Sequence, residues 1–170
     1  MSVDDTSRSP AERKSAIKQR HEQAANEVVP EDRQLYIDGE WVPSISGETF
    51  ETTDPTTGET LAEVAAGSAE DIDRAVGAAW DAYEEVYSDY STAQRQAMLE
   101  GMAAAVEENK EEFARLESLD NGKPITEARI DMDLVVDHFR YFAGIARAHE
   151  GRTVDTDDSR HVQTLQEPYG

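Results

Sequence analysis

Two β-prone triplets flank an Asp-Gly pair in the stretch Leu35-Tyr36-Ile37-Asp38-Gly39-Glu40-Trp41-Val42. Both central residues of a type I′ turn need positive φ, and aspartate and glycine tolerate that conformation better than most residues. The backbone twist of such a turn also matches the twist of the strands that it joins. The stretch therefore predicts an antiparallel hairpin with strands over 35–37 and 40–42.

A second hairpin is expected directly downstream. The segment Asp54-Pro55-Thr56-Thr57-Gly58 is typical of a turn, because proline presets φ and glycine accepts the left-handed region at the turn's end. The strands on either side would be Phe50–Thr53 and Thr60–Ala65.

From Ser68 the apolar residues change to helical spacing. Ser68-Ala69-Glu70-Asp71 and Ser91-Thr92-Ala93-Gln94 are capping boxes that predict two helix starts. A third, shorter helix should end at Asn121-Gly122-Lys123-Pro124, where glycine and proline break it. The apolar positions expected on these helices are Ile72, Ala75, Val76, Ala79, Trp80 and Tyr83 in the first, Met98, Met102, Ala105 and Val106 in the second, and Phe113, Leu116 and Leu119 in the third.

The last helix is expected from about Thr126 to Glu150, with an edge strand over His161–Glu167 after it. Its apolar stripe would hold Ile130, Leu134, His138, Tyr141, Phe142 and Ile145. On this pattern His138 is interpreted as a hydrogen-bonded core histidine, and Trp80 and Tyr83 as part of a buried helix face. None of the four histidines pairs with another at a metal-ligand spacing.

Residues 1–33 are polar and charged, and we interpret them as a mobile extension or a loosely docked helix. Ser9-Pro10-Ala11-Glu12 predicts the start of a short helix, with proline at its first position. The apolar residues that follow are too sparse to bury a helix face. The expected division of the chain is therefore an extension over 1–33 and a folded part over 34–170.

The chain is strongly acidic, with 37 Asp and Glu residues against 16 Lys and Arg residues and a net charge of −21. Such a surplus repels nucleic acids and anionic lipid surfaces. Because the acidic residues are spread along the whole chain, they favour a solvated surface suited to high salt; a docking face for a basic partner is the alternative. We expect the fold to weaken at low ionic strength.

The sequence holds no cysteine, so it offers no disulfide and no thiolate nucleophile. Its first ten residues lack the apolar core of a signal peptide, and no stretch of about 18 apolar residues could span a membrane. We expect a cytoplasmic protein.

Five stretches resemble one known family, in the order and spacing of that family. The stretches are Leu35-Tyr36-Ile37-Asp38-Gly39-Glu40-Trp41-Val42, Asp54-Pro55-Thr56-Thr57-Gly58-Glu59, Leu119-Asp120-Asn121-Gly122-Lys123-Pro124, Phe139-Arg140-Tyr141-Phe142-Ala143-Gly144 and Glu167-Pro168-Tyr169-Gly170. Through them residues 35–170 are similar to the N-terminal part of the NAD(P)-dependent aldehyde dehydrogenases, and among these to the betaine-aldehyde and broad-specificity enzymes.

The resemblance implies an α/β fold in which β-hairpin and β-arm strands are followed by a four-helix region, without the Rossmann-type sheet or the catalytic domain. In the family the helices cover the nucleotide-binding sheet and the β arm makes oligomer contacts, so a homo-oligomer is expected of the whole enzyme. The family oxidises an aldehyde to a carboxylate with NAD or NADP through a cysteine thiohemiacetal. The nucleophile, the general base and the cofactor loop are not found in these 170 residues.

Candidate site residues also follow from the resemblance. Asp120, with the backbone carbonyls of Thr52 and Thr53, would bind a monovalent cation such as K⁺ or Na⁺; the alternative is a turn residue that bonds its own backbone. Ile130 and Leu134 would line the substrate entrance tunnel, or else pack in the core. No catalytic or cofactor-binding residue is assigned.

Two hypotheses remain open for the chain as it stands. The first is the N-terminal portion of an aldehyde dehydrogenase that is inactive alone, binds no cofactor and exposes the apolar helix faces that the missing part would cover. The second is a non-catalytic product that acts as an oligomerisation or interaction module.

Overall fold

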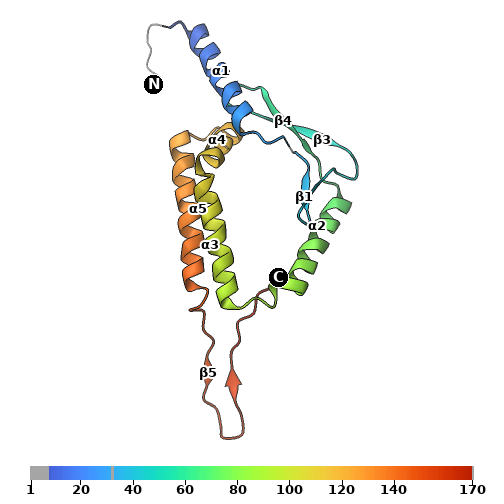
Figure 1. Cartoon of the computed structure of the whole chain (residues 1–170), viewed down its shortest axis with the longest axis vertical. Coiled ribbons are helices and arrows are strands. Elements are labelled where there is room, and N and C mark those ends of the chain that lie inside the picture. Colours follow the sequence, from blue (N-terminus) through green and yellow to red (C-terminus); the bar gives the residue numbers. More distant parts are fainter. Residues whose placement is uncertain (1–7, 32, 170) are drawn as a thin grey trace.

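The computed structural model describes residues 8–31 and 33–169. The helices over 10–28, 92–108, 110–121 and 125–145 lie together on one side of the molecule (Figure 1). The helix over 69–82 lies on the other side, with the strands over 35–42 and 49–65. The order of elements is α1 (Pro10–Val28), β1 (Leu35–Ile37), β2 (Glu40–Val42), β3 (Thr49–Thr53), β4 (Thr60–Ala65), α2 (Ala69–Ala82), the π-helical turn η1 (Tyr83–Tyr87), α3 (Thr92–Glu108), α4 (Lys110–Asn121), α5 (Ile125–Ile145), β5 (Thr153–Val154) and β6 (Val162–Gln163).

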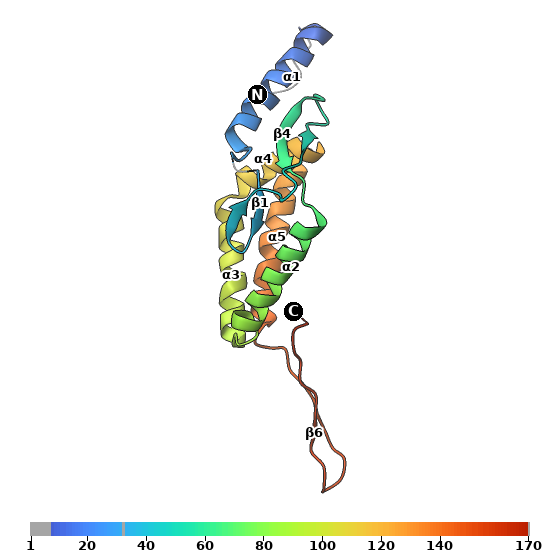
Figure 2. The same ribbon diagram turned by 90° about the vertical axis from the view of Figure 1, so that its right-hand side faces the viewer.

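The strands form three separate antiparallel hairpins, β1–β2, β3–β4 and β5–β6. Leu35 pairs with Val42 and Ile37 with Glu40 in the first, and the turn residues Asp38 and Gly39 both have positive φ, 55° and 78°. The predicted type I′ hairpin is confirmed. The β5–β6 hairpin projects away from the rest of the molecule (Figure 2).

All three predicted capping boxes are formed. Ser9, Ser68 and Ser91 each accept a hydrogen bond from the backbone three residues on, and the side chain at that position bonds back to the cap. The helix after Ser9 is 19 residues long, rather than short, and it packs against α4. The proposed division at residue 33, part of which lies outside the described residues, stays a prediction.

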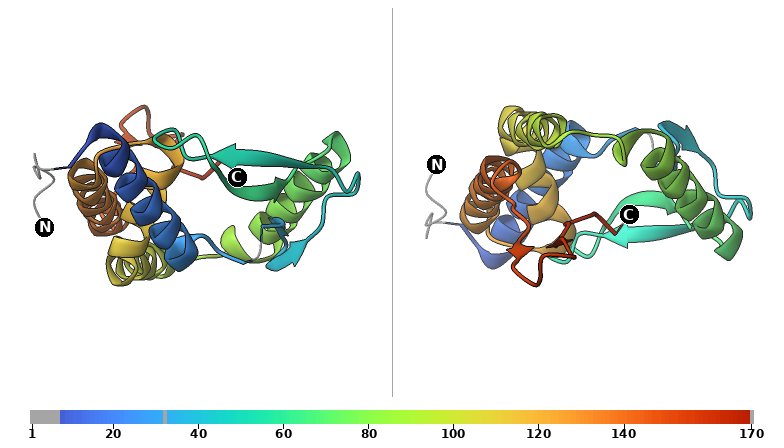
Figure 3. Two further views of the ribbon diagram at one scale, coloured as in Figure 1. Left: turned by 90° about the horizontal axis from the view of Figure 1, so that it is seen from above. Right: turned by 90° about the horizontal axis from the view of Figure 1, so that it is seen from below.

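The core is small and consists mostly of alanine. Alanine side chains let helices approach closely, and α5 packs in this way against both α3 and α4. Seen along the long axis, these helices and α1 form one group beside α2 and the β3–β4 hairpin (Figure 3). The buried apolar residues are Val28, Ala62, Ala103, Ala114, Leu119, Ala128, Val136 and Ala143.

The stripe predicted for α5 faces outward, and the interpretation of His138 as a core residue is wrong. The buried positions are Ala128, Val136 and Ala143, whereas His138 and the other stripe residues are exposed. The helix is apolar on two faces, and the face chosen from the sequence is the one without a partner in this chain. Trp80 of α2 is likewise 49 % exposed, so its assignment to a buried face is also wrong. The expected exposure of apolar helix faces is confirmed.

Two predicted boundaries also need correction. The last helix ends at Ile145, not near Glu150, and the expected strand over 161–167 is reduced to Val162–Gln163. Residues 146–167 are exposed apart from half-buried Ala146. Because helices and strands in proteins owe most of their stability to packing, exposed segments of favourable sequence stay irregular.

Aromatic side chains surround the junction between α2 and α3. Rings of neighbouring members lie 5.7–6.2 Å apart, and Arg95 lies over the Tyr87 ring at 5.2 Å. The half-buried Tyr83 hydroxyl donates to the backbone oxygen of Pro168 at 3.3 Å, which joins the far end of the chain to this junction. The aromatic residues around this junction are Trp80, Tyr83, Tyr87 and Tyr90.

Candidate functional site

The turn between α4 and α5 lies against the turn of the β3–β4 hairpin. Gly122 caps the C-terminal end of helix α4, and its φ of +78° places it in the left-handed region. A Cβ on this glycine would stand 3.0 Å from Cγ of Pro55, so the two turns are in close contact. This contact brings the Asn121-Gly122 and Asp54-Pro55 motifs together from distant parts of the sequence.

Asp120 and Thr52 meet at this junction. The Thr52 hydroxyl donates to Oδ1 of Asp120 at 2.8 Å. Thr53 is the exposed last residue of β3, at a register shift that separates it from Thr52. Two of the three predicted cation-site residues are thus in direct contact, and both carry the oxygen atoms that hard cations prefer.

The described residues contain no group of three or more His, Cys, Asp or Glu side chains that could hold a metal ion. A cation at Asp120 would therefore depend on backbone carbonyls and water for most of its ligands. The binding of K⁺ or Na⁺ here stays a prediction.

Lys123 fastens the α4–α5 turn to the two helices that flank it. Its ammonium group donates to Glu117 of α4 and to Asp131 of α5. Hydrogen bonds to Asp131 and then to Glu117 raise the pKa of Lys123 to about 12, so the lysine stays charged at neutral pH. Asp133 contacts Lys110 instead, so Asp131 and Asp133 point to different faces of the helix.

A largely apolar groove of about 630 Å³ opens next to the Asp120–Thr52 contact. Leu61 and Val64 of β4 form one wall, and Phe113, Met132 and Val135 of α4 and α5 form another. Three acidic side chains, Glu117, Asp120 and Asp131, also line it.

Ile130 and Leu134 are not among the residues that line this groove. They are 52 % and 48 % exposed, on the outward face of α5. They are therefore not core residues of this chain. Their predicted role in a substrate tunnel stays a prediction.

Asp54 begins the β3–β4 turn as a buried carboxylate. It accepts hydrogen bonds from the Thr56 backbone at 2.8 Å and the Thr57 hydroxyl at 2.9 Å, and Nδ1 of His21 lies 2.6 Å from its Oδ2. Burial alone would raise the pKa of Asp54, but these hydrogen bonds outweigh it and lower the pKa below the ordinary value. The contact with His21 was missed, because no local pattern relates two residues 33 positions apart.

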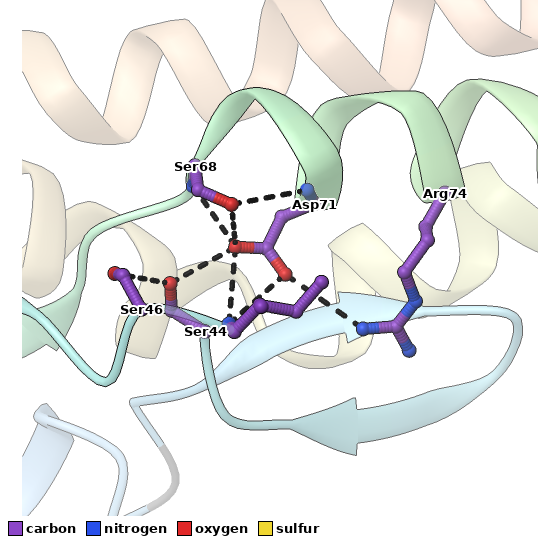
Figure 4. Close-up of polar contacts among 6 residues, drawn as sticks. Ser44, Ser46, Ser68, Asp71 and Arg74 are labelled. Carbon is purple, nitrogen blue, oxygen red and sulfur yellow. Dashed lines mark hydrogen bonds and ion pairs between the residues drawn. The ribbon is translucent and has the colours of Figure 1, made fainter.

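Asp71 forms the most heavily bonded polar cluster (Figure 4). Its carboxylate accepts from the Ser68 backbone at 2.9 Å, from the hydroxyls of Ser68 and Ser44, and from the Ile45 backbone at 3.2 Å. The Ser68 backbone N–H does most to lower the pKa of Asp71 to about 2, against the opposing effect of burial. The capping box predicted the bonds to Ser68, whereas no sequence signal pointed to Ser44 and Ile45.

The described residues offer no cradle for a dinucleotide. Every sheet in this part of the chain is a two-stranded antiparallel hairpin, whereas a dinucleotide binds at the carboxyl ends of parallel strands. The sequence also holds no cysteine that could attack an aldehyde. NAD or NADP thus does not fit the residues present.

Solved structures define the class of protein to which this arrangement of hairpins and helices belongs. The betaine aldehyde dehydrogenase from Staphylococcus aureus in complex with NAD⁺ aligns with a TM-score of 0.75 and 34 % identity, over 80 % of this chain and 27 % of that one. The chain thus has the fold of the N-terminal part of aldehyde dehydrogenases, which confirms the predicted α/β class without a Rossmann-type sheet.

The sequence comparisons agree. The chain belongs to the aldehyde dehydrogenase family, whose sequence model matches residues 41–170. The mitochondrial benzaldehyde dehydrogenase of Antirrhinum majus is 44 % identical over 138 residues, and acetaldehyde dehydrogenase 2 of Cupriavidus necator is 41 % identical over 136 residues. These alignments cover 80 % and 79 % of this chain but only 26 % and 27 % of the relatives, so the chain spans about a quarter of their length.

Among the described residues, no helix has both the length and the apolar composition needed to cross a membrane.

Proposed function

We propose that these 170 residues are the N-terminal portion of an oxidoreductase that oxidises an aldehyde to a carboxylate with NAD⁺ or NADP⁺. The observation that carries this proposal is the family match over residues 41–170, together with the NAD⁺-bound neighbour that has the same fold. The nucleophilic cysteine, the general base and the dinucleotide cradle would come from residues outside this sequence. The 170-residue chain alone would then bind no cofactor and turn over no aldehyde.

The exposed apolar faces of α2 and α5 support this assignment. Ile72 and Val76 of α2, and Tyr141 and Phe142 of α5, are more than half exposed. A monomer rarely leaves such surface uncovered, and in the whole enzyme the nucleotide-binding sheet would cover it. The β5–β6 hairpin would serve as an arm for homo-oligomer contacts.

The exposed faces also favour the second candidate, an interaction module that binds intact relatives and has no activity. The two candidates differ in what the gene encodes after the Gly170 codon. We would extend the reading frame through the downstream genomic DNA and assay the product for aldehyde-dependent reduction of NAD⁺ and NADP⁺. If the product is active and alkylation of a downstream cysteine abolishes that activity, the result supports the enzyme. A stop codon with no further coding sequence would contradict the enzyme and leave the interaction module.

A further inference from the structure

Helix α1 is joined to the rest of the molecule through charged and polar side chains. Lys18 Nζ lies 2.7 Å from Glu59 Oε1, and His21 Nδ1 lies 2.6 Å from Asp54 Oδ2. At the other end of the helix, Arg115 of α4 donates to Glu27 at 2.9 Å. These contacts tie α1 to the β3–β4 turn and to α4, elements that lie 33 to 88 residues away in sequence.

Apolar burial contributes little to this attachment. Val28, in the last turn, is the one residue of α1 that is buried. Residues 33–169 are called the body below. Ile17 is half-buried, and the other apolar residues of α1 that approach the body are alanines. The hydrophobic contribution scales with the apolar area removed from water, so the part of α1 before Val28 gains little from it.

The charge of α1 is opposite to that of the body on which it lies. Residues 10–28 hold four Lys and Arg residues and three Glu residues, a net charge of +1 on a chain whose total is −21. The remaining residues therefore carry −22. A helix that is weakly basic is held against a strongly acidic surface, and long-range attraction adds to the three specific contacts.

Docking of α1 also affects the groove, because the residues that follow α1 line it. Val29, Pro30, Arg33 and Gln34 line the same groove as Phe113 and Val135. In addition, His21 contacts Asp54 at the start of the turn whose next residue, Pro55, packs on Gly122. Movement of α1 would thus remove one wall of the groove and one support of the β3–β4 turn.

We propose that α1 is an electrostatic strap, which docks on the acidic body at low ionic strength and is released by salt while the body stays folded. The screening length falls from about 30 Å at 0.01 M salt to about 3 Å at 1 M. The Lys18–Glu59 and Arg115–Glu27 pairs are partly solvent-exposed, so screening weakens their attraction. The same screening relieves repulsion among the acidic residues of the body, so strap and body respond to salt in opposite directions.

The absence of cysteine from the sequence makes a distance measurement straightforward. Cysteines introduced at exposed Gln19 of α1 and exposed Thr126 of α5 would carry nitroxide labels on the full 170-residue chain. At about 0.01 M KCl we expect one narrow distance distribution, and at about 1 M KCl its loss in favour of a broad one, with helical circular dichroism of the body retained. A narrow distribution that is the same at both salt concentrations would overturn the proposal.

A pair of double variants tests whether the specific contacts matter. Lys18→Gln with Glu27→Gln removes two of the three contacts without changing the net charge of α1, and we expect the narrow distribution to be lost already at low salt. Lys14→Gln with Glu22→Gln makes the same charge change at exposed side chains of the same helix and should leave it intact. If both double variants behave alike at low salt, the strap is not held by these contacts and the proposal fails.

Discussion

Asp71 shows how one carboxylate can hold two segments together. It caps its own helix through Ser68 and also bonds Ser44 and the Ile45 backbone in the loop after β2. Asparagine at this position has the shape of aspartate, but its NH₂ group would face hydrogen-bond donors where a carboxylate oxygen now accepts. We expect Asp71→Asn to lower the melting temperature by roughly 5 °C. Asp73→Asn, at an exposed position of the same helix, should have little effect.

The same residue predicts a pH dependence. The pKa of Asp71 is lowered from 3.8 to about 2, so the folded state binds its proton less tightly than the unfolded state does. The stability that Asp71 contributes is therefore fully present above about pH 4 and is lost as the pH falls toward about 2. Thermal melts should show a smaller fall in melting temperature over this range for Asp71→Asn than for the unchanged chain. Parallel curves would contradict the assignment.

Asp120 is the residue at which the cation hypothesis can be tested in the full-length enzyme. If its carboxylate binds K⁺, Asp120→Ala should raise the K⁺ concentration needed for half-maximal activity by on the order of tenfold. Thr52→Val removes the hydroxyl that contacts Asp120 but keeps the backbone carbonyl, so a smaller rise is expected. Asp137→Ala, an exposed acid on α5, controls for charge. A K⁺ dependence that Asp120→Ala leaves unchanged would refute the cation role.

Gly122 determines how α4 ends and how the two turns meet. Alanine there would adopt positive φ and would place a Cβ 3.0 Å from Pro55, so we expect Gly122→Ala to destabilise the fold by about 1–2 kcal/mol or more. Gly101 lies inside α3, with open space around the position of a Cβ. Gly101→Ala should stabilise by about 0.5–1 kcal/mol. Urea titrations of the two variants should therefore shift in opposite directions; a shift of the same sign in both would contradict this account.

Among the helices and strands, the features that depend on neighbouring residues could be predicted from the sequence. Capping boxes, the Asp38-Gly39 turn and the helix end at Gly122 depend on residues that are close in sequence, and each is formed. The direction in which α5 faces was not readable, because the helix is apolar on two sides and periodicity does not say which one has a partner. The contacts of Asp54 with His21 and of Asp71 with Ser44 join residues far apart in sequence, so no local pattern revealed them.

For the molecule as a whole, the small alanine core and the exposed apolar faces of α2 and α5 have one explanation. The side chains that would form a larger core face outward, where the rest of an aldehyde dehydrogenase would cover them. We expect the isolated chain to be marginally stable and to bind a hydrophobic dye such as ANS. Sharp two-state unfolding without dye binding would show that the chain is self-sufficient.

The acidic surface adds an electrostatic cost to this small core. A charge of −21 on 170 residues produces self-repulsion that favours expanded states, and salt screens it. We expect the melting temperature of the body to rise by several degrees, on the order of 5 °C, between dilute buffer and about 1 M KCl. Neutralising the exposed acids Glu84, Glu85 and Asp89 with Gln and Asn should raise the low-salt melting temperature and reduce the effect of KCl. Over the same range of KCl concentration, α1 is expected to leave the body. A melting temperature that rises while the narrow label distance is lost would show that the strap and the body respond to salt in opposite directions. A melting temperature that does not change with KCl would mean that the acidic surface is not adapted to salt.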